Sequence, residues 1–159
     1  MAGWFATSAK AIERWTLHAA LADHDWVIPA LQTLHIMAIG VLVAGALVVA
    51  LRAWAIVGVA WPLARWRRRF AGSGAAALAV LAVTGSALTI AEPERELTSP
   101  VFRAKMLAVI GAVALSLWLD RRLRRVRDEV PLPERILAAL AVLVWAGVVS
   151  AGRWIAYAG

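Results

Sequence analysis

The amino-acid sequence predicts an all-α integral membrane protein, a transmembrane four-helix bundle preceded by an N-terminal interfacial amphipathic helix. Three observations lead to this fold class. Hydrophobic residues make up 62% of the 159-residue chain and its mean hydropathy is +0.74, whereas a soluble domain is about 45–50% apolar. Charged residues account for only 17% and are gathered in short clusters. Four apolar tracts lie between these clusters, each close to the ~20 residues that a helix needs to cross a bilayer.

The N-terminal segment, residues 4–21, is expected to form the interfacial helix. Large apolar residues such as Trp4 and Trp15 recur there at roughly helical spacing, but three charged residues interrupt the segment and prevent it from spanning. Tryptophan is typical of the headgroup level, so the helix is expected to lie in the plane of the membrane surface. The polar sequence ADHDW then breaks this helix, and Pro29 suits the first turn of the next one.

Four membrane spans are expected to follow, and together with the interfacial helix they make one integral membrane domain, residues 1–159. The spans are expected at about 28–51, about 71–91, about 101–119 and about 134–157. Alanine, glycine and serine are frequent within them, which favours close helix packing. The segment VAWPLARWRRRF between the first two spans is expected to run partly along the inner surface.

The distribution of basic residues predicts the orientation. Eleven of the 17 Lys and Arg residues follow the first and third spans, so these two connections are expected to be cytoplasmic by the positive-inside rule. The other six lie on the opposite side together with six acidic residues. Both termini are therefore expected outside the cytoplasm. The arginine clusters are expected to fix the topology, with attraction of anionic lipid as a secondary effect, so the net charge of +7 does not indicate nucleic acid as a partner.

Four ionisable residues, one from each span, are expected to share a layer in the outer half of the bundle. His35 lies about seven residues inside the first span, or ~10 Å deep. Glu92 closes the second span, Lys105 begins the third and Arg153 lies near the outer end of the fourth. Ionisable side chains inside a membrane are costly and mark functional sites. In the alternative interpretation each is satisfied locally, by a hydrogen bond from His35 to another helix, a Glu92–Lys105 ion pair, or extension of Lys105 and Arg153 to the headgroups.

The three histidines are the candidate metal ligands, because neutral imidazole binds haem iron, copper or zinc. His18 and His24 precede the first span, and a folded-back N-terminal helix would bring His18 towards His35. Their spacing matches no standard metal motif. In the alternative interpretation both His18 and His24 are solvated interfacial residues, and this interpretation is favoured for His24. The chain has no Cys, which excludes thiolate sites and disulfides. It also lacks a phosphate-binding glycine loop and a serine nucleophile elbow, which disfavours a stand-alone enzyme.

Three segments, WVIPALQTLHIMAIGVLVAGALVVALRAWAIVG, TIAEPERELTSPVFRAKM and VWAGVVSAGRWIAY, resemble a family of small bacterial four-helix membrane proteins of unknown function. The motifs are P-x5-H at Pro29 and His35, F-x-x-K at Phe102 and Lys105, and G-R-x-I-x-Y at residues 152–157. The family is similar in layout to the membrane part of copper-resistance proteins and to four-helix b-type cytochromes. The resemblance implies a multi-pass protein of the bacterial inner membrane with periplasmic termini. The sequence VALRAW lacks the Asp that the family pattern places before the inner Arg, so Arg52 is left without that partner.

The function predicted first is binding of haem b, or a related redox cofactor, in the outer half of the bundle for electron transfer. His35 is the expected axial ligand, and Lys105 and Arg153 are expected to pair with the propionates. Glu92 and His18 are assigned to the same site. Only one histidine lies within a span, whereas four-helix cytochromes usually place two on facing helices. A sixth iron ligand would therefore be His18, His24, Met106 or a residue of a partner chain, or the iron would have none.

Two alternatives remain open. In the first, the chain is an accessory or structural membrane subunit without a cofactor, and its charged layer docks another membrane protein or closes a homo-oligomer. In the second, the chain binds or transports copper, with His35 and His18 as metal ligands and Met37 or Met106 as sulfur ligands suited to Cu(I). The accessory role ranks just below the cofactor hypothesis, and copper ranks third.

Overall fold

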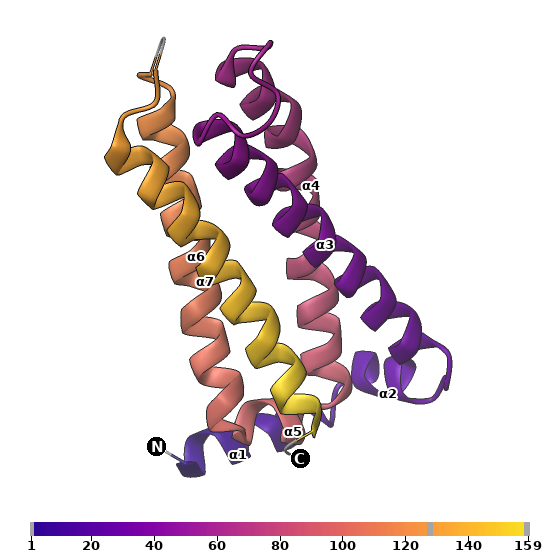
Figure 1. The fold of residues 1–159 in the computed structure, drawn as a ribbon. Helices are drawn as coiled ribbons and strands as arrows, with labels where there is room; N and C mark the ends of the chain where they lie inside the picture. The colour runs from indigo at the N-terminus through magenta and orange to yellow at the C-terminus, as the bar shows by residue number, and fades with distance from the viewer. Residues whose placement is uncertain (1, 127–128, 158–159) are drawn as a thin grey trace.

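A computed structural model of the chain describes residues 2–126 and 129–157, although the side chains of residues 2, 3, 22 and 152–157 lie outside the described part. The described residues form helices and connecting turns, without a strand (Figure 1). The helices are α1 (Ala2–Ile12), α2 (Thr16–Ala22), α3 (Val27–Ala53), α4 (Leu63–Ala91), α5 (Pro93–Thr98), α6 (Pro100–Leu123) and α7 (Leu132–Tyr157).

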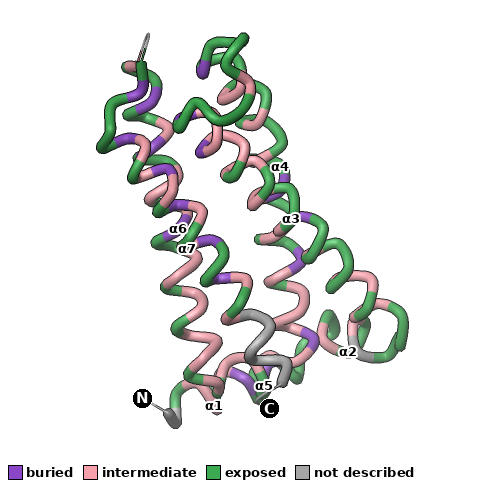
Figure 2. Tube along the Cα trace, viewed as in Figure 1, coloured by how far each residue is buried: buried purple, intermediate pink, exposed green. Residues whose placement is uncertain are grey.

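Four of these helices, α3, α4, α6 and α7, are long and apolar enough to cross a membrane. The predicted fold class, an all-α protein with four spanning helices and an N-terminal helix, is therefore confirmed. Most of the surface of the four helices is exposed or only partly buried, as Figure 2 shows. Because a soluble protein of this size would bury such apolar surface in its own core, the exposed surface of these helices is matched to lipid.

The N-terminal segment differs from the single helix expected over residues 4–21. It is divided into α1 and α2 by a turn at residues 13–15, where Trp15 has an extended backbone with φ −75° and ψ 140°. The division lets the two pieces pack separately, α1 against α5 and α2 against α4. Both lie at the end of the bundle where α7 also ends, and the two arginine-rich connections lie at the opposite end (Figure 1).

The second spanning helix begins earlier than expected. α4 starts at Leu63, directly after Pro62, which has an extended backbone with ψ 144°. The arginine run at 67–69 therefore occupies the first turns of the same helix as the span, instead of a separate segment along the membrane surface. Proline favours this boundary because it lacks the N–H that a helix interior requires. The run thus projects directly from the end of the spanning helix.

The short helix α5 and the start of α6 are set by two prolines. Pro93 and Pro100 each occupy the first turn of a helix, where a missing backbone N–H costs nothing. Ser99 precedes α6 and its Oγ accepts a hydrogen bond from the backbone N–H of Phe102 at 3.3 Å, which satisfies one of the free donors of the helix end. This start places Lys105 in the second turn of α6, beside α5.

The four spanning helices form two pairs, α3 with α4 and α6 with α7, which are joined by packing of α3 on α7. One group of buried residues, including Ala53, Leu119 and Leu123, lies at the arginine-rich end. A second, around Ala112 and Trp145, lies further along, and its contribution from α3 begins at Leu42. No described α3 residue before Leu42 belongs to either group. This N-terminal part of α3 packs on α4 and α2.

The connection between α3 and α4 is held by hydrogen bonds to its backbone. Arg52 Nε donates to the carbonyl oxygen of Trp61 at 3.1 Å, so this arginine, which lacks the acidic neighbour of the family pattern, binds the connection instead. Trp66 Nε1 donates to the carbonyl oxygen of Gly58 at 3.2 Å. Trp54 Nε1 reaches α7, where it donates to the carbonyl oxygen of Arg135 at 3.0 Å.

Candidate functional site

The imidazole of His35 is bound to α4 through a chain of hydrogen bonds. Its Nδ1 lies 2.8 Å from Oγ1 of Thr84, and that hydroxyl donates to the carbonyl oxygen of Val80 at 2.7 Å. A threonine hydroxyl has a single hydrogen, so the Thr84 oxygen must accept from His35. Nδ1 therefore carries the ring proton. The neutral ring then has its free lone pair on Nε2, the atom available to a metal or another donor.

The position of the His35 ring also depends on the glycine next to Thr84. A Cβ added at Gly85 would lie 3.5 Å from Cε1 of His35, so the ring packs directly on the backbone of α4. Thr84 is buried, with 4% of its surface exposed, and His35 is half-buried. The hydroxyl and the small residue together hold the imidazole at one place and in one orientation. Sequence reasoning missed Thr84, although a polar residue inside an apolar span was the available signal.

Lys105 connects the histidine with the acidic residues of α5. Its ammonium acts electrostatically on both His35 and Glu96. Glu96 is half-buried, and this burial raises the pKa of its carboxyl, although the positive charges of Lys105 and Arg95 oppose the shift. Glu96 was also missed from the sequence, where it was only counted among the six acidic residues of the outer side. The structure shows that it lies within electrostatic range of Lys105.

Glu92 has a different partner from the one considered in the sequence. It ends α4, and its carboxylate forms an ion pair with Arg95 at 2.8 Å. Arg95 also lies 3.9 Å from the carboxylate of Glu96. Arg95 is largely exposed, so these pairs contribute little to stability, about 0–1 kcal/mol each. They gather the acids of α5 around one arginine at the membrane surface.

His18 is bound to the last turn of α4. Its Nδ1 lies 2.8 Å from the carbonyl oxygen of Ile90, and because a carbonyl can only accept, Nδ1 donates. The hydrogen bond satisfies one of the carbonyls that a helix end leaves free. Thr84 and Ile90, which hold the two histidines, are ~9 Å apart along the axis of α4 and about 120° apart around it. The contacts with α4 therefore hold His18 and His35 at different places.

The remaining predicted residues add no further ligand to the described site. The side chain of Arg153 lies outside the described residues. His24 is exposed, and Met37 is 64% exposed and lies about 200° around α3 from His35. Within the part of the chain that the structure describes, no three His, Asp or Glu side chains are grouped to hold a metal ion. Among the described residues, the candidate ligand of the site is therefore the imidazole of His35, through its Nε2 atom.

These features define a multi-pass helical membrane protein with a polar layer of His35, Thr84, Lys105 and Glu96 towards one end of its spans. The chain belongs to the family of unknown function DUF6644, whose family model matches residues 25–158. No curated protein and no solved structure matches the chain. Membership of an uncharacterised family is thereby confirmed, whereas the likeness to copper-resistance proteins and b-type cytochromes stays a prediction.

Proposed function

We propose that this protein binds haem b within its membrane-spanning helices, with Nε2 of His35 as an axial ligand of the iron, and that it transfers electrons through this group. The observation that carries the proposal is the hydrogen-bond chain from His35 through Thr84 to the carbonyl of Val80. Histidines that bind metals almost always donate their other N–H to a protein acceptor, which fixes the tautomer and the orientation of the ring. His35 has this arrangement, although among the described residues no group of three His, Asp or Glu side chains is placed to hold a metal ion.

The surroundings of His35 favour a large cofactor over a bare metal ion. Helix bundles commonly house haem between facing helices, whereas a zinc ion is held by three or four protein donors. Neither group of buried core residues extends along α3 as far as His35. The half-buried Lys105 supplies a positive charge near the ring, as haem propionates require. We rank haem above copper because α3 lies outside the core groups at His35 and because Lys105 supplies a positive charge near the ring.

Absorbance spectroscopy tests the proposal directly. The full chain, produced in cells supplied with haem and extracted in mild detergent, is expected to show a Soret band and roughly one haem per chain. The variant His35→Ala is expected to lose the band. His24→Ala is the matched control, because His24 is an exposed histidine outside the spans, and it should retain the haem of the wild type.

Three results would overturn the haem proposal. A wild-type protein without haem that also fails to take up added hemin would support the accessory-subunit alternative. Copper in the wild type, lost in His35→Ala, would support the copper alternative. Equal haem content in His35→Ala and the wild type would show that this histidine is not the ligand. Circular dichroism on each variant checks that loss of the band is not loss of the helices.

A further inference from the structure

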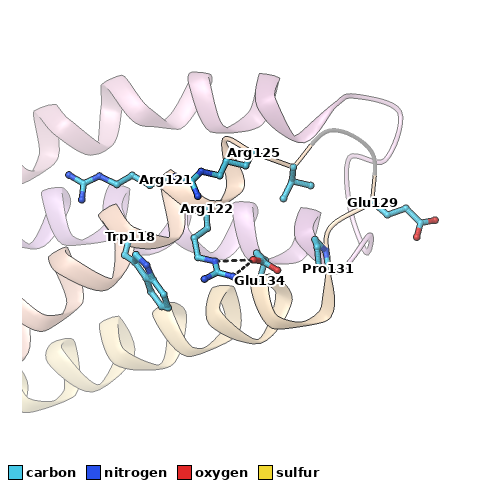
Figure 3. A pocket seen from close by; sticks show the side chains of 8 residues that line it. Trp118, Arg121, Arg122, Arg125, Glu129, Pro131 and Glu134 are labelled. Carbon is cyan, nitrogen blue, oxygen red and sulfur yellow. Dashed lines mark hydrogen bonds and ion pairs between the residues drawn. The ribbon is translucent and has the colours of Figure 1, made fainter.

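A second candidate site lies at the opposite end of the molecule, where α6 ends and α7 begins. It is a hollow of about 610 Å³ between these two helices. α6 contributes Trp118, Arg121 and Arg122 to its lining, the turn after α6 contributes Arg125, and α7 contributes Glu134. Figure 3 shows these side chains, together with Glu129, which points away from the arginines towards the outside. The lining therefore carries three arginines and two glutamates, and its net charge is positive.

The inner wall of the hollow is a fixed ion pair. Arg122 donates from Nε and from Nη2 to Oε1 of Glu134, both at 2.9 Å. Glu134 is buried, so its charge depends on this partner. The guanidinium of Arg122 also lies 5.3 Å from the ring centre of Trp118, within the range of a cation–π contact. The guanidinium of Arg122 therefore binds side chains of the protein, and it sets the positions of Glu134 and Trp118.

The other two arginines of the hollow differ from Arg122. Among the described residues, neither Arg121 nor Arg125 forms a side-chain hydrogen bond or an ion pair, although both line the hollow. They are four residues apart in the sequence, with Arg121 in the last turn of α6 and Arg125 in the turn that follows this helix. Nearby basic residues differ, since Arg67 and Arg124 both bind Asp120. Within the described part of the chain, two guanidiniums thus lie without a partner at a concave surface, which is an arrangement suited to an anion.

The location of the hollow indicates which anion it takes. Within α6, Trp118 lies about 20° from Leu107 around the helix axis, and Arg121 lies about 20° from Ile110. Leu107, Ile110 and Leu117 on this side of the helix are exposed, and Trp118 is 45% exposed. An apolar stripe on a spanning helix thus leads to a tryptophan and then to the two arginines. A phospholipid has the same order of chemistry, with acyl chains, a glycerol region at the level where tryptophan concentrates, and a phosphate.

We propose that the end of α6 binds an anionic phospholipid of the adjacent leaflet. Arg121 and Arg125 bind its phosphate, as paired guanidiniums do, and an acyl chain lies along the stripe of Leu107, Ile110 and Leu117. Arg122 does not bind the lipid but holds the wall of the site through Glu134. The site is independent of His35 and of any cofactor bound there. It gives one particular arginine pair a role beyond the general attraction of basic residues to anionic lipid.

Thermal unfolding of the full chain in detergent, with added lipid, tests this site. The probes are dioleoyl phosphatidylglycerol, dioleoyl phosphatidylcholine and inorganic phosphate. The test variant is Arg121→Gln/Arg125→Gln. The control is Arg68→Gln/Arg69→Gln, which removes the same charge from the same end of the molecule at exposed residues that do not line the hollow. A third variant, Arg121→Lys/Arg125→Lys, keeps the charge but removes the planar guanidinium geometry.

Phosphatidylglycerol is expected to raise the unfolding midpoint of the wild type saturably, and phosphatidylcholine much less. The half-saturating concentration is expected to rise roughly tenfold or more in the Arg121→Gln/Arg125→Gln variant, to rise less in the lysine variant, and to change little in the control. Equal losses in both glutamine variants would reject a specific site in favour of general surface charge. Equal stabilisation by inorganic phosphate would reassign the pair to a soluble anion. If Arg121→Gln/Arg125→Gln does not fold, the lysine variant decides, since wild-type affinity there would rule out paired guanidinium recognition.

Discussion

Arg67 in α4 and Asp120 in α6 form a charged link between two helices that are not neighbours in the packing order. Nε of Arg67 donates to Oδ1 of Asp120 at 2.9 Å, and its Nη2 forms an ion pair with the same oxygen. Arg124 binds the other oxygen, Oδ2, at 2.7 Å. The Arg67 side chain is only 11% exposed, so its charge depends on Asp120. One carboxylate thus ties the α3–α4 pair to the α6–α7 pair at the arginine-rich end.

Asp120→Asn is expected to destabilise the protein by about 2 kcal/mol. The variant leaves the guanidinium of Arg67 largely buried without a counter-charge, and the loss is smaller than for a fully buried pair because Asp120 is one-third exposed. Thermal unfolding in detergent measures the change. Glu129→Gln is the control, since Glu129 is exposed and no described side chain pairs with it. Equal stability of Asp120→Asn and the control would show that the link contributes nothing.

Thr84→Val is expected to weaken haem binding about 10- to 100-fold, if the function proposed for His35 is correct, because the variant removes the acceptor that holds Nδ1–H. Thr84→Ser keeps the hydroxyl and should bind haem nearly as the wild type does. Titration of the purified protein with hemin, followed by absorbance, gives both affinities. Wild-type affinity in Thr84→Val, with binding abolished in His35→Ala, would show that the ring is held by packing on Gly85 alone.

Gly58→Ala is expected to destabilise the connection between α3 and α4 by about 1–3 kcal/mol. Gly58 has φ +63°, a conformation that favours glycine, and an added Cβ would lie 2.5 Å from Cζ2 of Trp66. Gly72→Ala is the matched control, because a Cβ there meets no atom within 4 Å and alanine favours a helix. The unfolding midpoint is expected to fall for Gly58→Ala and to stay equal or rise for Gly72→Ala. Equal midpoints would contradict the close contact with Trp66.

Glu96 is expected to make stability depend on pH. Because burial raises the pKa of its carboxyl in the folded protein, the folded state binds more protons than the unfolded state between the unfolded and folded pKa values. Stability therefore falls as the pH rises through that interval. Glu96→Gln should remove this part of the pH dependence, whereas Glu94→Gln, an exposed residue of the same helix, should retain it. Unfolding midpoints across mildly acidic pH measure the effect, and parallel curves for Glu96→Gln and the wild type would contradict it.

The sequence predicted the class of fold because hydropathy and length are local properties. Four apolar tracts suffice to identify four spans, whatever their packing. The positions of His35 and Lys105 near the same end follow from counting residues along antiparallel spans. The same counting put the arginine clusters at the other end, as the structure has them (Figure 1). The boundaries were less accurate, since α4 begins at Leu63 and the N-terminal helix is broken at residues 13–15.

The partners within the site came only from the tertiary structure. His35 binds Thr84, 49 residues away in the sequence, and this contact depends on how α3 and α4 are rotated about their axes. The spans are apolar on nearly every side, since lipid and neighbouring helices are equally apolar surroundings, so their sequences carry little information about rotation. The same holds for Arg67 with Asp120, and for Arg121 and Arg125, which have no side-chain partner among the described residues. The sequence by itself determined which segments enter the membrane and which ends carry charge, and only the packing of the helices decided which polar side chains meet.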